Sequence, residues 1–243
     1  MTRMLYLNDM YMREFESKVA SVTNGKYVVL EDTAFYPKSG GVAGDAGSLI
    51  RESDGKEFKV VFVGKFKGNI SHEVDADGLE RGDKVKGIID WDRRRMLMRY
   101  HTAAHVLSGI FWHEGRVKIS GNEIDLDGGR MDFTMEDFNR QVIEGYVERS
   151  NEIVQRDLTV ETYCISRDEL DQDPNLTKLV AGLPKGIEEV RIVDIKGFDR
   201  QPDGGCHVKS TGEIGVIRLI KMKNKGKSNR RLYFELEEQR SVE

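Results

Sequence analysis

The stretch RRRMLMRYHTAAHVLSGIF, residues 93–111, decides how this chain is organised. Leu97, His101, His105 and Ser108 recur at intervals of three and four residues, which places them on one side of a helix. Two histidines four residues apart on a helix can direct their imidazoles at one ion. The stretch therefore predicts a helix that carries part of a metal site.

A second segment, PDGGCH at residues 202–207, supplies the rest of the predicted site. Gly204 and Gly205 lack side chains, so the backbone can turn tightly and bring His207 against the helix. Three histidines with an open fourth position form a catalytic zinc site. We therefore expect His101, His105 and His207 to bind Zn²⁺ and to support hydrolysis of an ester or amide. The remaining histidines, His72 and His113, are expected to be surface residues.

Residues 1–89 alternate short runs rich in β-branched and aromatic residues with turn residues, which is typical of a small β-barrel. The runs are residues 18–22, 26–32, 47–52, 56–74 and 83–90. The glycine-rich stretch Thr33–Gly47 is either a barrel loop or a loop whose bare backbone approaches a ligand or the neighbouring domain. The sequence thus predicts an N-terminal barrel domain.

Residues 90–243 mix helical and strand patterns, which indicates an α+β domain with helices packed on one face of an antiparallel sheet. Strands are expected within residues 117–134, 159–170, 189–201, 208–226 and 230–238, and helices over residues 135–157 and 174–180. The buried side of the first of these helices is predicted to carry Phe138, Val142, Ile143, Tyr146, Ile153 and Val154. The predicted fold class is therefore α+β, with a β-barrel domain followed by a two-layer domain.

The composition limits the cellular setting and the partners. The formal charge of −4 argues against bulk electrostatic capture of nucleic acid, although basic clusters occur at Arg93–Arg95 and Lys221–Arg231. The chain has neither an apolar stretch long enough for a transmembrane helix nor the features of a signal peptide. Two cysteines are too few for a disulfide framework. We expect a cytoplasmic protein without a membrane partner, and the oligomeric state is not predicted.

Four motifs in order carry a family resemblance: LEDTAFYPKSGGVAGDAGSL (30–49), HTAAHVLS (101–108), GRMDF (129–133) and GFDRQPDGGCHVKSTGEIGVIRL (197–219). Together they resemble the alanyl-tRNA editing proteins, AlaX, and the editing domain of alanyl-tRNA synthetase. The chain length and the barrel are similar to the medium form, AlaX-M. The resemblance implies an enzyme that hydrolyses tRNA(Ala) mischarged with serine or glycine, in which residues 90–243 form the zinc-binding editing domain. It implies no nucleotide cofactor.

The resemblance transfers to particular residues. His101, His105 and His207 match the family's zinc histidines. Asp203 stands where the family usually has a cysteine, and Cys206 stands where it usually has a threonine. Asp203 is therefore expected either to bind the metal or to act as a catalytic base, because a carboxylate can do both. Cys206 is the other candidate ligand, although its side chain should point away from that of its neighbour His207.

Substrate contacts are expected from three further positions. The backbone amides of Gly204 and Gly205 are candidates to stabilise the oxyanion, and the Ser120 hydroxyl is a candidate to select serine, if it is not simply bonded to backbone. Contacts to tRNA phosphates are expected from some of Arg93–Arg95, Lys221, Lys223, Lys225, Lys227, Arg230 and Arg231. Arg130 and Asp132 are expected to be structural.

Three other functions remain compatible with the sequence. A fourth protein ligand would close the zinc site and make the chain a non-catalytic, zinc-stabilised tRNA-binding module. Editing domains of threonyl-tRNA synthetase share similar histidine and cysteine motifs, so another mischarged tRNA is a second alternative. A metal-dependent hydrolase of small molecules is the third, and it is disfavoured because the sequence defines no apolar pocket.

Overall fold

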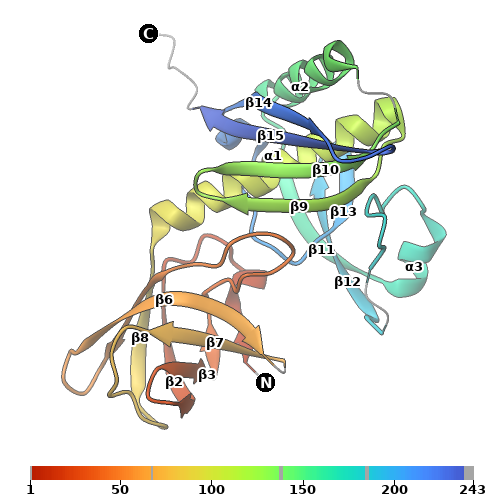
Figure 1. Ribbon diagram of the computed structural model, residues 1–243. Coiled ribbons are helices and arrows are strands. Elements are labelled where there is room, and N and C mark those ends of the chain that lie inside the picture. The colour runs from red at the N-terminus through yellow and green to blue at the C-terminus, as the bar shows by residue number, and fades with distance from the viewer. Residues whose placement is uncertain (1, 67, 137–138, 184–185, 238–243) are drawn as a thin grey trace. The chain divides into compact units, whose positions relative to one another are not determined.

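The structure is a computed structural model that describes residues 2–66, 68–136, 139–183 and 186–237 (Figure 1). The chain divides into two compact units, the first ending at Leu97 and the second beginning at Met98. This division lies inside helix α1, Trp91–Gly115, so one helix contributes residues to both units. The domain limits of 1–89 and 90–243 remain a prediction.

The first unit contains a closed barrel with strands in the order β2, β3, β7, β6, β5, β8. These strands are β2 (Glu14–Thr23), β3 (Tyr27–Leu30), β5 (Gly47–Arg51), β6 (Glu57–Phe66), β7 (Asn69–Val74) and β8 (Lys84–Ile89). The short strands β1 (Arg3–Met4) and β4 (Asp32–Thr33) pair beside the barrel, with a 3-10 turn at Leu5–Leu7. Leu30, Phe35, Leu49 and Phe58 are fully buried in its core. The predicted barrel is therefore confirmed.

His72 lies inside the barrel, so the prediction that it is a surface residue is wrong. Its Nδ1 lies 2.9 Å from the carbonyl oxygen of Val28, and its Nε2 lies 2.8 Å from Oγ1 of Thr33. A carbonyl only accepts, so Nδ1 carries the proton and Nε2 accepts from the hydroxyl. Burial lowers the pKa of His72 to about 4. The prediction failed because the middle of β7 is buried on both faces, which alternation of residues cannot reveal.

The glycine-rich stretch 33–47 lies in the barrel unit and is held by a buried ion pair. The Asp45 carboxylate accepts from the Tyr36 amide at 2.5 Å and from Nε of Arg94 at 2.9 and 3.0 Å. Arg94 also donates to the carbonyls of Met10, at 2.9 Å, and Ala34, at 2.5 Å. A Cβ on Gly44 would lie 2.8 Å from the Lys38 amide nitrogen, so this position requires glycine. The loop is thus fixed against the first turn of α1 by a buried arginine.

The second unit contains a four-stranded antiparallel sheet in the order β14, β15, β10, β9. The strands are β9 (Ile119–Asp125), β10 (Gly128–Thr134), β14 (Val216–Asn224) and β15 (Asn229–Glu237). Helix α1 runs behind this sheet (Figure 1). Phe111 of α1 stacks on Phe133 with ring centroids 4.1 Å apart, and Tyr100 packs on Phe234 at 5.8 Å. The expected packing of a helix on an antiparallel sheet is therefore present.

Helix α2 (Arg140–Gln155) packs on β14, and a second antiparallel sheet contains β11 (Val160–Ser166), β12 (Glu189–Ile195) and β13 (Asp199–Pro202). A 3-10 turn, Thr211–Ile214, precedes β14. The side chain of Asn139 caps the start of α2. Val142, predicted to be buried on this helix, is 39% exposed, and Phe138 lies outside the described residues.

The helix predicted over residues 174–180 is absent from this described segment, which forms turns and a bridge between Leu179 and Ile119. A helix forms earlier instead, as α3, Arg167–Gln172. Ser166 and Glu169 form a capping box: the Ser166 hydroxyl accepts from the Glu169 amide at 3.2 Å, and the Glu169 carboxylate accepts from the Ser166 amide at 2.8 Å. The single strand expected over residues 189–201 is also wrong, because β12 and β13 form a hairpin there. Among the described residues, no helix combines the length and apolar content that crossing a membrane requires.

Candidate metal centre

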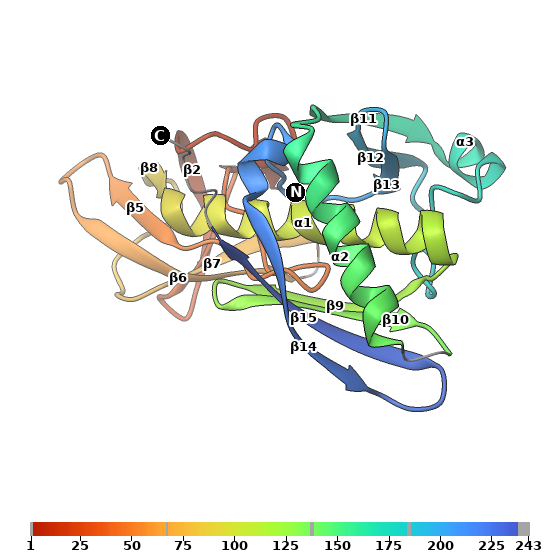
Figure 2. The ribbon, with the colours of Figure 1, turned by 90° about the horizontal axis from the view of Figure 1, so that it is seen from above.

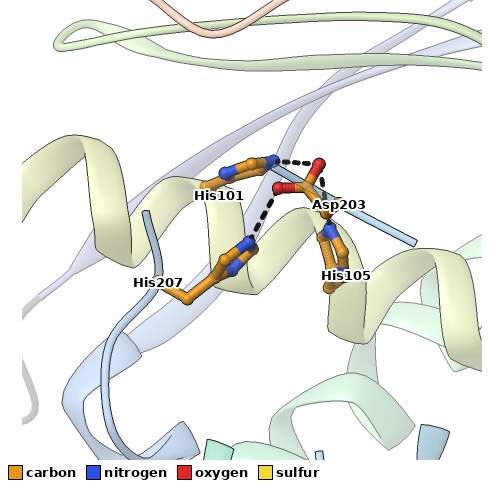
Figure 3. Close-up of side chains that lie close together, drawn as sticks. All are labelled: His101, His105, Asp203 and His207. Carbon is orange, nitrogen blue, oxygen red and sulfur yellow. Dashed lines mark hydrogen bonds and ion pairs between the residues drawn. The ribbon is translucent and has the colours of Figure 1, made fainter. Parts of the chain in front are cut away.

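Four side chains converge on one point of the second unit (Figure 3). His101 and His105 come from α1, Asp203 follows β13 directly, and His207 lies in the loop after it. One carboxylate oxygen of Asp203 lies 3.5 Å from Nε2 of His101 and 3.9 Å from Nε2 of His105. The other oxygen lies 3.2 Å from Nε2 of His207. The structure therefore brings together all three histidines that the sequence predicts, together with Asp203.

The four groups fit a metal ion by distance and by chemistry. Their potential ligand atoms all lie within 4.8 Å of one another. A tetrahedron with zinc–ligand bonds of about 2.0–2.1 Å has edges of about 3.4 Å. The Asp203 oxygen nearest His101 lies 3.5 Å from that ring, and the other oxygen lies 3.2 Å from His207. Three imidazole nitrogens and one carboxylate oxygen are all accepted zinc ligands. The cluster can therefore hold a metal ion.

The electrostatics of the cluster favour the protonation states that metal ligands need. Burial lowers the pKa of His105, and it lowers the pKa of His207 well below the usual value. Burial alone would raise the pKa of Asp203, but the charge of His101 and the close contacts with the three imidazoles bring it well below its usual range. An ionised Asp203 carboxylate and the neutral rings of His105 and His207 offer lone pairs to an ion.

Thr102, between the two helical histidines, orients the third. Its hydroxyl donates to the Met98 carbonyl at 2.9 Å and accepts from the Val208 amide at 3.2 Å. The same oxygen lies 3.2 Å from Nδ1 of His207. Because the only hydroxyl proton is already used, Nδ1 of His207 must donate, which leaves its Nε2 facing Asp203 with a lone pair. Sequence reasoning missed this residue, although it lies inside the HTAAH motif.

Gly204 and Gly205 lie in the loop of residues 203–207, which we call the ligand loop, and they differ in their packing. A Cβ on Gly205 would lie 2.4 Å from Cε1 of His101, so the backbone must pass directly against that ring. The Gly205 amide donates to the Asp203 carboxylate at 2.5 Å, which differs from the oxyanion role expected for it. Gly204 is exposed, and a Cβ there would have no atom within 4 Å. Arg191 of β12, a residue that sequence reasoning missed, donates to the carbonyls of Asp203 and Gly205 at 2.9 Å each.

The remaining predicted residues lie outside the four-group cluster. Cys206 is buried beside it but is not one of its members. Ser120 is exposed on β9 and donates to Oδ1 of Asn229 at 3.1 Å, so its bond goes to a side chain and not to backbone. His113 has a side chain that is 44% exposed, consistent with a surface residue, and its Nε2 lies 3.0 Å from an Asp199 carboxylate oxygen.

The predicted phosphate contacts divide into two groups. Arg94 and Arg230 are 1% and 6% exposed, so these two members of the predicted set are buried and are not surface cations. Arg230 instead donates to carbonyls at the turn of the β14–β15 hairpin, among them Gly226 at 2.7 Å. Arg231 binds Asp132 with both ends of its guanidinium, at 2.6 and 2.7 Å. In the basic cluster Lys221–Arg231, the exposed cations are Lys221, Lys223, Lys225 and Lys227.

Comparison with known proteins places the chain in a family. Residues 190–233 match the family model of the threonyl and alanyl tRNA synthetase second additional domain, and residues 4–93 match that of class II (A) tRNA synthetases. The alanyl-tRNA editing protein AlaX-M of Methanosarcina mazei is 50% identical over 248 residues, covering 99% of each chain. The AlaX-M protein of Saccharolobus solfataricus is 40% identical over 236 residues, covering 96% of this chain and 98% of the relative.

A longer relative matches in one part only. The alanine–tRNA ligase of Sulfurisphaera tokodaii is 36% identical over 223 residues, which span 90% of this chain but 24% of the ligase. The match to the AlaX-M proteins extends instead over nearly the whole length of both aligned chains. The chain therefore belongs to the family of alanyl-tRNA editing proteins AlaX-M.

Proposed function

We propose that the protein is a zinc-dependent trans-editing deacylase that hydrolyses the ester of tRNA(Ala) mischarged with serine or glycine. The name of its full-length relatives supports alanyl-tRNA editing. The observation that carries the chemistry is the buried cluster of His101, His105, His207 and Asp203. The substrate ester is already activated, so the reaction needs no nucleotide cofactor.

Asp203 is the member of the cluster that a substrate can approach. Its side chain is 23% exposed, whereas those of His101 and His207 are 6% and 0% exposed. The exposed Gly204 lies next to it in the chain and adds no side chain to the approach. We therefore place the aminoacyl ester on the Asp203–Gly204 side of the cluster.

The proposed reaction needs one acid–base group and one oxyanion donor. When bound, Zn²⁺ supplies a Lewis acid that polarises the ester carbonyl and lowers the pKa of a water molecule. Asp203 accepts a proton from the attacking water while the water oxygen bonds to the carbonyl carbon. The Gly204 amide donates to the developing oxyanion, since the Gly205 amide is engaged by Asp203. The carbon–oxygen bond to tRNA then breaks, and its 3′ oxygen takes the proton from Asp203.

The proposed substrates follow from the limits of recognition by size. A synthetic site built for alanine cannot strongly reject glycine, which is smaller, or serine, which adds only a hydroxyl. A second site that hydrolyses glycyl-tRNA(Ala) and seryl-tRNA(Ala) removes both mischarged products. Ser120 is proposed to favour seryl-tRNA through its hydroxyl, which must give up its hydrogen bond to Asn229 or accept a second one to do so.

The test is deacylation of seryl-, glycyl- and alanyl-tRNA(Ala) by purified protein, with the metal content measured on the same sample. Selective hydrolysis of the seryl or glycyl ester supports the proposal. His105→Ala should lose both metal and activity, and Asp203→Ala shows whether this residue serves the metal, the proton transfer or both. Ser120→Ala should lower the preference for the seryl over the alanyl ester.

A structural zinc site is the second candidate function, because the short distances from Asp203 to the three imidazoles would allow it to close the coordination sphere as a fourth ligand. In that case the protein would hold one zinc tightly, unfold on chelation and hydrolyse none of the three esters. The protein could instead hydrolyse a mischarged tRNA(Thr) and none of the tRNA(Ala) esters. That result would show that the proposed substrate is wrong and that the proposed ester hydrolysis is right.

A further inference from the structure

The outer face of the four-stranded sheet carries an ordered set of charged and aromatic side chains. Leu232 and Phe234 of β15 point inward onto α1, so Arg231 and Tyr233 between them point outward. The strand register places Lys223, Arg231 and Asp132 in one row across β14, β15 and β10. The next row contains Lys221, Tyr233, Arg130 and Glu123. We call these seven residues the outer face.

The outer face is most positive at the β14–β15 hairpin. Lys223 lies directly opposite Arg231, a pairing of like charges that destabilises a sheet. Asp132 offsets only one of the two cations, since it binds Arg231 with both carboxylate oxygens. Lys221, Lys223 and the neighbouring Lys225 and Lys227 are all exposed. A destabilising pair of like charges on the surface is expected where function requires it. An anion bound beside Lys223 and Arg231 would offset their repulsion.

Tyr233 lies at the centre of this field. It is partly exposed, and the Lys223 ammonium lies 5.5 Å from the centroid of its ring. A hydrogen bond from Arg231, together with the charges of Lys223 and Arg130, lowers the pKa of its hydroxyl. Figure 2 shows that the turn between β14 and β15 projects away from α1 and α2, so neither helix covers this end of the sheet. An aromatic ring on an open sheet face among cations is a common platform for the bases of single-stranded RNA.

We infer that the outer face binds an RNA strand, with a base stacked on Tyr233 and phosphates neutralised by Lys221 and Lys223. The inference rests on the proposed function for the identity of the RNA, which is the substrate tRNA. The inference places the bound RNA strand on the side of the sheet opposite α1. It also explains why a chain with a formal charge of −4 concentrates lysines on one hairpin.

The test measures binding of uncharged tRNA(Ala) transcript to the full chain as a function of salt, which separates binding from deacylation. Lys221→Gln/Lys223→Gln should weaken binding about tenfold or more and reduce the salt slope by about 1 for each lysine. Tyr233→Leu should weaken binding at least about fivefold, while Tyr233→Phe keeps the ring and should bind nearly as the unmodified protein does.

The matched control is Arg140→Gln/Arg156→Gln, which removes two exposed cations, one at the first residue of α2 and one at its C-terminal cap, on the other side of the same sheet. It should leave the salt slope within about 0.5 of the original value. Deacylation by the lysine double variant should show a raised KM with kcat unchanged. Unaltered binding and slope in that variant, or the same loss in the α2 control, would overturn the inference. Binding that depends on the outer face in a protein without deacylase activity would reject the proposed function only.

Discussion

The hydroxyl of Thr102 contacts Nδ1 of His207 at 3.2 Å and thereby decides which nitrogen of that ring faces Asp203. The hydroxyl proton is given to the Met98 carbonyl, so the imidazole must donate. Threonine in this position thus orients a candidate metal ligand located on a separate loop. Groups of this kind commonly change metal affinity 10- to 100-fold when they are removed.

Thr102→Val should therefore weaken zinc binding by about 10- to 100-fold, because valine keeps the shape but cannot fix the ring of His207. Thr102→Ser retains the hydroxyl and should restore most of the affinity. Competition with a chelator measures the affinity, and circular dichroism verifies the fold. Equal affinity in the valine and serine variants would show that the contact does not position the ligand.

The neighbouring glycines should respond differently to one added methyl group. Gly205→Ala places a Cβ within 2.4 Å of His101 and should displace this ligand, with loss of bound metal and of deacylation. Gly204→Ala meets no atom within 4 Å and should keep the metal. If Gly204 lies on the substrate path as proposed, its alanine variant should show a raised KM at full metal content. Metal analysis and steady-state kinetics of the two variants test both statements, and full metal retention by Gly205→Ala would contradict the first.

The buried His72 makes the stability of the protein depend on pH. Its pKa is about 4 in the folded protein and about 6.5 in an unfolded chain, so the unfolded state binds more protons between these values. The stabilisation is complete above pH 6.5 and is lost as the pH falls towards 4. Between pH 7 and pH 5 the loss should be about 2 kcal/mol.

Urea unfolding of the unmodified protein and of His72→Gln at both pH values isolates this contribution, because the other titrating groups are common to the two. The variant should lose about 2 kcal/mol less than the unmodified protein over this interval. Parallel losses in the two proteins would mean that His72 does not titrate between folded and unfolded states in this range.

The Arg94–Asp45 pair should be a major contributor to the stability of the barrel unit. Both side chains are 1% exposed, so Arg94→Met leaves a carboxylate buried without its charge partner. Breaking such a pair costs about 3–5 kcal/mol. Arg95→Met, one residue further along α1 and exposed, should change the free energy of unfolding by less than about 0.5 kcal/mol. The double variant Arg94→Met/Asp45→Asn should recover part of the loss, and a small effect of Arg94→Met alone would refute the assignment.

Features that arise from local periodicity were predictable. Alternation along residues 1–89 predicted the barrel, and the spacing of His101 and His105 placed two candidate ligands on one face of α1. The Gly-Gly turn predicted the approach of His207, which packing of Gly205 against His101 confirms. Errors occurred where a local signal was overlooked, as in the capping box of α3, or where a strand is buried on both faces, as at His72.

The sequence by itself therefore determined the types of element and the residues able to bind a metal, because helical and strand periods and turn chemistry act between near neighbours. Only the tertiary structure decided that Thr102 fixes the tautomer of His207, that Arg191 holds the ligand loop, and that Arg94 and Arg230 are buried. These facts depend on groups up to about a hundred positions apart meeting in space. A charged side chain follows the same local pattern whether it faces water or a buried partner, and only packing distinguishes the two.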